Sequence, residues 1–313
     1  MIEVQGLTKF YGKRSAIQDV TFSVPRGQVL GFLGPNGAGK STTMRILTGY
    51  IGATSGSASV DGFDVFRQSL EVRRRVGYLP ETTPLYNEMR VEGFLDLMCK
   101  LRGIAPSKRR ARVDEAIESC GLDERRAEVI GRLSRGLRQR VGLAQAIVHE
   151  PDVLILDEPT AGLDAGQTRE TRELIKQLGR RQTVVLSSHI LSEVEATCER
   201  VLIMNQGQIV ADGAPGKLAQ RFGSGKRHEV ELVVRGEAAA VEAVVSGVAG
   251  VDEVTITAEG EDAVRVAAIT SAADLRETLS RAVILAGFGL LEVQERTLSL
   301  EDVFPQLTSA EGT

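Results

Sequence analysis

The sequence has few cysteines, and they are not arranged in pairs. Cys99, Cys120 and Cys198 lie far apart, and none belongs to a C-x-x-C motif. This spacing favours neither a disulfide framework nor a zinc site, so we expect a reducing, cytoplasmic setting.

An excess of positive charge and a long apolar segment are also lacking. The formal net charge is −4, whereas a protein that coats nucleic acid is strongly basic, so no nucleic-acid partner is expected. The longest apolar-looking segment, 282–291, is too short for the ~18 residues of a membrane span. The opening residues MIEVQGLTKF alternate like a strand and do not resemble a signal peptide. Any role at a membrane is therefore expected to depend on a partner protein.

The composition is that of a globular protein, with 313 residues, 42% hydrophobic and 26% charged. Residues 1–221 alternate short apolar strands with longer helical stretches, which predicts an α/β domain. The segments 28–34, 152–158 and 183–188 are apolar for most of their length, as expected for strands covered on both faces. From about 85 to 150 the pattern is almost entirely helical, which predicts a helical subdomain.

A second, smaller domain is predicted at residues 229–313, after a glycine-containing linker, FGSGKRH, at 222–228. Segments typical of strands are 228–234, 251–258, 263–269 and 290–296, and segments typical of helices are 237–245 and 272–286. The order βαββαβ predicts a small α+β domain with a ferredoxin-like fold.

The segment GPNGAGKS matches the phosphate-loop pattern G-x-x-x-x-G-K-[ST] directly after an apolar strand and before a helical stretch. Its glycines let backbone N–H groups turn toward phosphates, and the following helix start favours anions. Lys40 is expected to reach the β- and γ-phosphates, and Ser41 to offer a hydroxyl to Mg²⁺. The predicted nucleotide-binding residues are Gly34, Pro35, Asn36, Gly37, Ala38, Gly39, Lys40, Ser41 and Thr42.

Asp157 and Glu158 end the apolar strand VLILDE. Ligands of open α/β sheets lie beyond the carboxyl ends of the strands, so both side chains are expected beside the phosphate loop. Asp157 suits a Mg²⁺ ligand, and Glu158 suits orienting or deprotonating an attacking water. His189 follows the strand TVVLSS and is expected to contact the γ-phosphate from the same edge. A lone histidine is otherwise more often structural.

The segment LSRGLRQR, residues 133–140, begins an apolar helix in an unusual way. Ser134 resembles an N-cap, Gly136 is expected to keep the backbone open, and a helix starting near Leu137 would present free N–H groups. The segment is therefore a candidate second anion site, with an ordinary capped helix as the alternative. We call residues 133–140 the signature segment.

From Met1 to about Gly213 the sequence resembles the ATP-binding cassette (ABC) family. The matching elements, in the family's order and spacing, are Tyr11 in KFYGKRSAI, the phosphate loop at 34–42, GYLPE (77–81), the signature segment, VLILDEPTAGLD (153–164) and SSHILSE (187–193). The resemblance implies a phosphate-loop ATPase fold, ATP and Mg²⁺ as ligands, and catalysis by Lys40, Glu158 and His189.

The resemblance also implies partners. In this family two cassettes form a head-to-tail dimer, here with a second copy of the chain, so that Ser134 and Gly136 would face the γ-phosphate of the partner's ATP. Asp164 would lie at the subunit interface, with a simple turn aspartate as the alternative. Tyr11 would stack on adenine, with a core tyrosine as the alternative. Separately encoded membrane subunits would hold the protein peripherally at the inner face of the cell membrane.

Some positions depart from the commonest family pattern. Glu81 replaces a glutamine that links Mg²⁺ to the membrane subunit; its carboxylate still offers an oxygen to the metal. Arg135 replaces the first glycine of the signature, Leu137 its glutamine, and Ala161 a frequent serine. Together with GYLPE and a final SLEDVF (299–304), these departures make the sequence resemble one group of exporters, which includes antibiotic-resistance, lipid or polysaccharide, and gliding-motility ATPases. SLEDVF also suits an amphipathic helix packed on its own domain.

The sequence therefore predicts the ATP-hydrolysing subunit of an ABC exporter. One alternative is an ABC ATPase that acts on ribosomes or DNA, but such proteins usually carry two cassettes or long coiled-coil insertions. Another is a regulatory binding protein, which the intact Lys40, Glu158 and His189 disfavour. The basic segment SKRRAR (107–112) suits either lipid headgroups or a solvated helix face.

Overall fold

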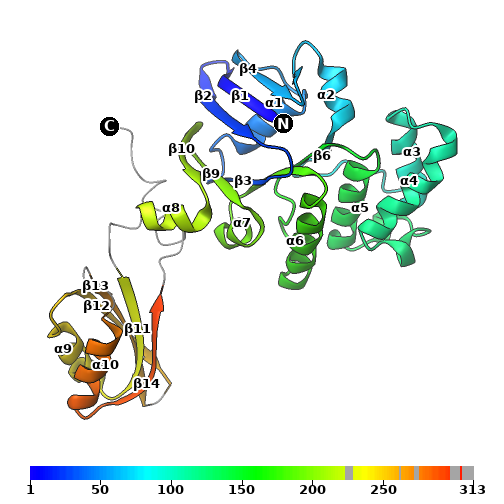
Figure 1. Ribbon diagram of the computed structural model, residues 1–313. Helices are drawn as coiled ribbons and strands as arrows, with labels where there is room; N and C mark the ends of the chain where they lie inside the picture. The colour runs from blue at the N-terminus through cyan, green and yellow to red at the C-terminus, as the bar shows by residue number, and fades with distance from the viewer. Residues whose placement is uncertain (223–227, 261, 271–274, 297–303, 305–313) are drawn as a thin grey trace. The chain divides into compact units, whose positions relative to one another are not determined.

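A computed structural model describes residues 1–222, 228–260, 262–270, 275–296 and 304. The chain divides into two compact units, Met1–Pro215 and Gly216–Thr313, which are drawn in Figure 1. Helix α8 ends at Phe222, and strand β11 begins at His228. The interior of the predicted linker, 223–227, lies outside the described residues, so the predicted linker and the predicted domain division stay predictions.

The larger sheet of the first unit has the strand order β10-β9-β3-β8-β7-β6. Its strands are β3 (Val29–Leu33), β6 (Val76–Leu79), β7 (Val153–Leu156), β8 (Thr183–Ser188), β9 (Arg200–Asn205) and β10 (Gln208–Gly213). Only the pairing of β10 with β9 is antiparallel among these described strands. Every residue of β3, β7 and β8 is buried, because layers cover both faces. The apolar strands predicted from the sequence are confirmed.

A second, antiparallel sheet has the order β2-β1-β4-β5. Its strands are β1 (Ile2–Tyr11), β2 (Arg14–Val24), β4 (Ser55–Val60) and β5 (Phe63–Asp64). The two sheets share one hydrophobic core, in which Phe22 and Phe32 meet edge to face with ring centroids 5.2 Å apart. The sequence analysis did not separate this sheet from the α/β pattern, because register shifts between β1 and β2 interrupt a regular alternation.

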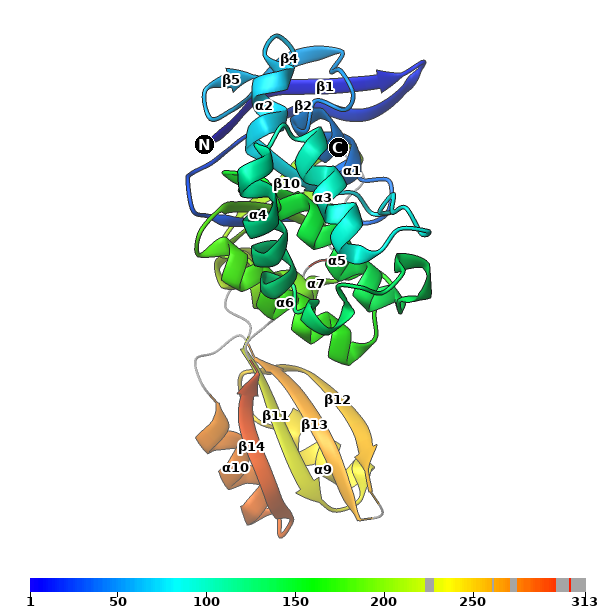
Figure 2. The same ribbon diagram turned by 90° about the vertical axis from the view of Figure 1, so that its right-hand side faces the viewer.

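The helices of the first unit connect and cover these sheets (Figure 2). They are α1 (Lys40–Leu47), α2 (Ser69–Arg75), α3 (Val91–Leu101), α4 (Pro106–Ser119), α5 (Arg135–Ile147), α6 (Ala165–Gly179) and α7 (Leu191–Thr197), and α8 (Pro215–Phe222) follows at the division between the units. Helices α3, α4 and α5 occupy the segment predicted to be helical. Over the described residues, no helix combines the length and apolar character that crossing a membrane requires.

The second unit contains an antiparallel sheet of order β12-β13-β11-β14 with helices on one face (Figures 1 and 2). Its elements are β11 (His228–Arg235), α9 (Ala238–Ser246), β12 (Val251–Glu259), β13 (Ala263–Thr270), α10 (Arg276–Leu285) and β14 (Gly289–Arg296). Valines and leucines from both layers, among them Leu232, Val266, Val241 and Leu279, form its core. Apart from Phe304, the segment SLEDVF lies outside the described residues.

A partly buried histidine in the first unit, His149, gives its stability a pH dependence. The Nε2 atom of His149 lies 3.2 Å from Val76 O, and Nδ1 is buried without a hydrogen-bond partner among the described residues. Burial, with a smaller effect of nearby Arg102, lowers the pKa of His149 to about 4. The folded protein therefore holds this ring neutral at a pH where the unfolded chain protonates it.

We predict that this histidine destabilises the fold as the pH falls. Because the pKa of His149 is lower in the folded state, its contribution to the free energy of unfolding is fully present above pH ~6.5 and is lost toward pH ~4. Between pH 7 and pH 5 this loss lowers the free energy of unfolding by about 2 kcal/mol. His149→Gln, which keeps a donor for Val76 O, should flatten that part of the dependence. Urea unfolding followed by circular dichroism at both pH values measures it. If the free energy of unfolding of the variant still differed between pH 7 and pH 5 by as much as that of the parent, this account would be contradicted.

Candidate nucleotide site

The phosphate loop lines a cleft of about 510 Å³ at the carboxyl edge of the larger sheet. The loop connects β3 to α1, so β3 delivers it to that edge. The residues around the cleft are Tyr11, Arg14, Ala16, Asn36, Gly37, Ala38, Gly39, Lys40, Ser41, Thr42, Glu81 and Glu158. Most residues predicted to bind a nucleotide therefore lie together, although they come from distant parts of the chain.

Close packing explains two of the loop's glycines. Gly39 has a φ of +107°, and a Cβ there would lie 2.6 Å from Ile17 Cγ2. A Cβ on Gly34 would lie 2.3 Å from Met204 O. The loop is thus pressed against β2 and β9, and only glycine permits that approach. The backbone is held in place beside the start of α1, where N–H groups favour an anion.

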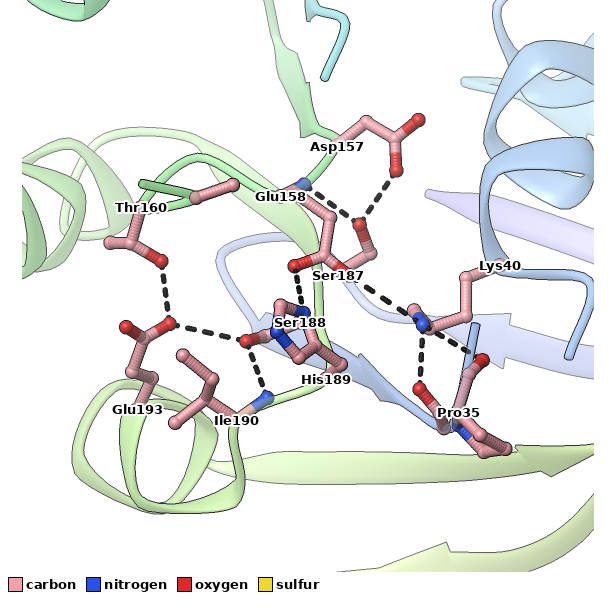
Figure 3. Close-up of polar contacts among 12 residues, drawn as sticks. Pro35, Lys40, Asp157, Glu158, Thr160, Ser187, Ser188, His189, Ile190 and Glu193 are labelled. Atoms are coloured by element: carbon pink, nitrogen blue, oxygen red, sulfur yellow. Dashed lines mark hydrogen bonds and ion pairs between the residues drawn. The ribbon is translucent and has the colours of Figure 1, made fainter. Parts of the chain in front are cut away.

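Lys40 is buried at the bottom of this loop (Figure 3). Its ammonium group donates to Gly34 O at 2.6 Å and to Pro35 O at 3.2 Å. It also lies 3.5 Å from Glu158 Oε1, and both side chains are more than nine-tenths buried. Glu158 offsets the charge of this ammonium, which is placed to donate to a phosphate that the loop holds once that phosphate replaces the carboxylate as its partner.

Asp157 joins the loop helix to two strands. Its Oδ1 atom accepts a hydrogen bond from Ser41 Oγ at 3.0 Å and another from Ser187 Oγ at 2.7 Å. Its Oδ2 atom is buried and has no hydrogen-bond partner in the described part of the chain. A buried, unpaired carboxylate oxygen next to a hydroxyl is the donor set that Mg²⁺ prefers. The residues present therefore fit a magnesium ion.

Glu158 and His189 contact each other directly (Figure 3). The Nδ1 atom of His189 lies 2.8 Å from Glu158 Oε2. Glu158 has a φ of +51°, a strained conformation for a residue with a side chain. Its amide donates to Ser187 Oγ at 2.9 Å, which holds the strained turn. The structure thus brings Lys40, Asp157, Glu158 and His189 together, as expected, while the predicted contact of His189 with a γ-phosphate stays a prediction.

A buried hydrogen-bond network beneath this pair was missed by the sequence analysis. Glu193 on α7 is only 8% exposed. Its Oε2 atom accepts from Thr160 Oγ1 at 2.5 Å and from Ser188 Oγ at 3.1 Å. Ser188 Oγ in turn accepts from the amide of Ile190 at 3.0 Å. The network fixes the segments on both sides of the Glu158–His189 contact; a glutamate four residues after His189 was its only signal in the sequence.

Tyr11, Arg14 and Glu81 form the rim of the cleft. Tyr11 ends β1 and is 49% exposed, so it is not a core residue. Arg14 begins β2, and its guanidinium lies near Gly37; its place on this rim was not predicted from the sequence. Glu81 is exposed and carries a carboxylate into the same cleft. The rim therefore holds an aromatic ring and charges of both signs.

The signature segment and Asp164 do not line this cleft. Ser134 caps α5 by accepting from the amide of Leu137 at 3.3 Å, and Asp164 caps α6 by accepting from the amide of Gln167 at 2.8 Å. Helix α5 begins at Arg135, so the expected start near Leu137 was wrong. Gly136 is buried in the first turn against Gln167, so it lies within the helix and does not keep the backbone open.

Tyr78 borders the site from β6. Burial, together with the charge of Asp157, raises the pKa of Tyr78 to about 12. The phenol is therefore neutral at every physiological pH. Neighbouring Gln145 donates to Tyr78 O at 2.8 Å, which ties the edge strand β6 to helix α5.

Comparisons with known proteins agree with this geometry. A family model described as ABC transporter matches residues 17–161. The linearmycin resistance ATP-binding protein LnrL of Bacillus subtilis (strain 168) is 32% identical over 257 residues, covering 82% of each chain. The daunorubicin resistance ATP-binding protein of Streptomyces coeruleorubidus is 33% identical over 308 residues, 98% of this chain and 95% of the relative. A solved dimeric bacterial ABC transporter cassette is 25% identical, with a TM-score of 0.63, over 68% of this chain and 98% of that chain.

The fold and the cleft together define a nucleotide-binding domain of the cassette type. The chain belongs to the ABC transporter family, as an ATP-binding subunit that hydrolyses ATP. The alternatives of a ribosome- or DNA-acting ATPase and of a purely regulatory binding protein are not supported, because the curated relatives described above are resistance ATP-binding proteins.

We expect Asp157→Asn to remove most of the Mg²⁺ dependence of nucleotide binding. Asparagine still accepts hydrogen bonds from Ser41 and Ser187 but lacks the charged second oxygen, so the gain in affinity on adding Mg²⁺ should shrink by about tenfold or more. Titration of a fluorescent ATP analogue with Mg²⁺ or with chelator measures that gain. Asp152→Asn, just before the other end of β7, is the matched control. Equal gains in the two variants would be inconsistent with a metal ligand at Asp157.

Proposed function

We propose that this subunit powers export through separately encoded membrane subunits, as one half of a homodimer at the inner face of the cell membrane. The observation that carries the proposal is the meeting of Lys40, Asp157, Glu158 and His189 beside the phosphate loop, through the Ser41–Asp157, Lys40–Glu158 and Glu158–His189 contacts. Export is supported by the linearmycin and daunorubicin resistance proteins, whose names describe resistance to toxic compounds. An antibiotic-like cargo follows from the same relatives.

The proposed nucleotide is ATP, held with Mg²⁺. Residues 34–42 surround the phosphates and Tyr11 stacks on the adenine. Ser41 and Asp157 would hold the ion, and Glu81, on the rim of the cleft, would offer it a carboxylate oxygen in place of an amide oxygen. When bound, Mg²⁺ neutralises the charge that develops on the phosphates. The unpaired Oδ2 atom of Asp157 supports this arrangement.

The proposed chemistry is attack of water on the γ-phosphate. Lys40 stabilises the phosphate charge, and a phosphate in the loop competes with Glu158 for the Lys40 ammonium, 3.5 Å away. Glu158 is thereby released to accept a proton from the attacking water. His189 contacts Glu158 at 2.8 Å, and we propose that it orients this carboxylate and reaches the γ-phosphate. Hydrolysis then reopens the dimer and completes the transport cycle.

The proposed homodimer completes each ATP site with the partner's signature segment. Ser134 is exposed at the start of α5 and Gly136 is buried in its first turn, and both lie away from the cleft of their own chain. A helix start that presents N–H groups suits a phosphate, and the solved dimeric cassette supports a paired arrangement. Ser134 and Gly136 then face the γ-phosphate held by the other subunit, with Asp164 at the interface.

The proposed surface for a membrane subunit is a second cleft, of about 740 Å³, beside Glu81. Tyr50, Leu85, Tyr86 and Met98 contribute apolar surface to it, and Tyr50 is 75% exposed. An exposed apolar cleft suits an amphipathic segment of a partner protein. Glu81 lines both this cleft and the nucleotide cleft, which supports a partner site adjacent to the ATP site.

The second unit is proposed to be a ferredoxin-like accessory domain. Its chain order of strands and helices is βαββαβ, and its sheet order is β12-β13-β11-β14. The daunorubicin resistance protein matches almost the whole chain, which supports a shared two-domain organisation. Residues 222–228 are the proposed linker, with 229–313 as the accessory domain and 1–221 as the ATP-binding domain.

We predict that Glu158→Gln abolishes hydrolysis while permitting ATP-driven dimerisation. Glutamine keeps the shape of the site but cannot accept the proton of water, so turnover should fall at least about 100-fold. Phosphate release and size-exclusion chromatography with ATP and Mg²⁺ measure the two effects. Glu173→Gln, on the surface of α6, is the control. A Glu158→Gln protein that hydrolyses ATP at the parental rate would refute the assignment of the base.

We predict that the signature segment acts on the partner's ATP. A mixed dimer of Ser134→Arg and Lys40→Ala subunits retains one composite site whose loop and signature are both intact, so it should turn over ATP although neither parent homodimer does. The matched control joins an unmodified subunit to one carrying both substitutions; each composite site then has one defect and should be inactive. Phosphate release from affinity-purified mixed dimers distinguishes the two. The reverse result, activity only in the control dimer, would place both motifs in one chain's site.

A further inference from the structure

Arg135 connects two parts of its own chain. In the proposed function, one of them serves this chain's own ATP site and the other serves the partner's. It is the first residue of α5, directly after Ser134. Its Nη2 atom donates to Ala161 O at 2.8 Å. Ala161 belongs to the segment Pro159–Asp164, which follows Glu158 and leads into α6. The arginine therefore joins the start of the signature helix to the segment that leaves the proposed catalytic base.

The backbone at Gly162 leaves room for the guanidinium of Arg135. A Cβ on Gly162 would lie 2.2 Å from Arg135 Cζ and 2.4 Å from both terminal nitrogens, so the guanidinium rests directly on the Gly162 backbone. Gly162 also has a φ of +69°, a conformation that favours glycine. Only a residue without a side chain allows this planar group to lie where it does.

A second residue of α5 reinforces the link. Gln139, four residues after Arg135 and thus on the same helix face, donates from Nε2 to Pro159 O at 2.8 Å. Two carbonyls of the segment, Pro159 O and Ala161 O, are therefore held by one face of one helix. Gly136 adds a close contact with Gln167 on α6. The segment that follows Glu158 is fixed to α5 at points on both sides of Thr160.

The position of Glu158 depends on this segment. Its φ of +51° is an unfavourable conformation that persists only while its surroundings determine it. On the near side, its amide bonds Ser187 Oγ. On the far side, Ala161 N donates to Glu158 O at 3.1 Å. Arg135 holds Ala161 by its carbonyl oxygen, and the N–H of the same residue donates to Glu158 O. Arg135 therefore acts on the Glu158 backbone through the hydrogen bond from Ala161.

We propose that Arg135 is a positioning residue for ATP hydrolysis: through Ala161 and Gly162 it fixes the turn that orients Glu158 in its own chain. This inference rests on the proposed function for the role of Glu158 as base and of Ser134 in the partner's site. It adds that each chain carries a direct mechanical link between its own hydrolytic residue and the signature it lends to its partner. The two ATP sites of the dimer are thereby connected through each subunit.

The first test uses Arg135→Met, which keeps the aliphatic stem and removes the donors. Hydrogen–deuterium exchange on the nucleotide-free full chain should become about tenfold faster at residues 159–164, with exchange at 34–42 unchanged. Arg132→Met removes a neighbouring exposed charge and should change neither segment. Unchanged exchange at 159–164 in Arg135→Met would overturn the link itself, whatever the function of the protein.

Steady-state kinetics test the consequence for catalysis. Arg135→Met should lower kcat about tenfold, since misplacing a catalytic group slows the chemical step, while KM for ATP stays within about twofold because the phosphate loop is intact. A melting temperature within about 2 °C of the parent excludes general destabilisation. Gln139→Leu should shift kcat in the same direction. A rise in KM at constant kcat would overturn the positioning role and indicate direct contact with ATP.

Mixed dimers locate the effect within the pair. With Lys40→Ala in one subunit, a single intact ATP site remains, served by Glu158 of the other subunit. Arg135→Met should lower activity by a larger factor when it lies in the subunit that supplies Glu158 than when it lies in the Lys40→Ala subunit, which supplies only the signature segment. The opposite pattern would assign Arg135 to the partner's phosphate and overturn the proposal. If instead Glu158→Gln hydrolyses ATP normally, the proposed function fails while the exchange result at 159–164 still stands.

Discussion

One buried carboxylate, that of Asp157, holds the site together. Its Oδ1 atom accepts from Ser41 on α1 and from Ser187 at the end of β8, so a single oxygen joins segments that are 116 and 30 residues away from it in the chain. Burial of an ionised carboxylate is unfavourable unless hydrogen bonds or a cation compensate the charge. Two hydroxyls serve one oxygen, and the other has no partner among the described residues. The parallel register of β7 and β8 is what brings these groups to one edge, so the core packing and the affinity for a cation depend on the same strands.

The next residue shows how the surroundings maintain an unfavourable backbone. A non-glycine residue with a φ of +51°, as at Glu158, costs about 1–3 kcal/mol. The bonds from its amide to Ser187 and from Ala161 to its carbonyl contribute on the order of 1 kcal/mol each, which is comparable to that cost. Beyond them, Glu193 holds Thr160 and Ser188 on either side. The strain is thus distributed over hydrogen bonds from several elements, and the orientation of Glu158 responds to each of them.

The sequence predicted the elements with strong local signals. Continuous apolar segments identified β3, β7 and β8, and the rule that ligands lie beyond the carboxyl ends of strands placed Lys40, Asp157 and His189 together. It did not predict the antiparallel sheet of β1, β2, β4 and β5, because bulges break the alternation. It placed the start of α5 near Leu137, two residues later than the observed start at Arg135, because Gly136 was expected to keep the backbone open before the helix. Glu193 and Arg14 were missed because their roles arise from tertiary contacts, and no spacing in the sequence records which hydroxyl or loop each side chain meets.

The same contacts give a structural role to one departure from the common signature pattern, the arginine at position 135. A glycine at position 135 has no side chain to reach Ala161 O, whereas the arginine present donates to that atom, 26 positions further along the chain. The guanidinium is exposed, so water competes for the bond, and its net contribution to stability is on the order of 1 kcal/mol. That is small against the whole fold but equals a several-fold change in the population of one loop conformation. Because Glu158 sits in a strained turn one hydrogen bond away, a change of that size acts on the orientation of the base far more than on the stability of the domain.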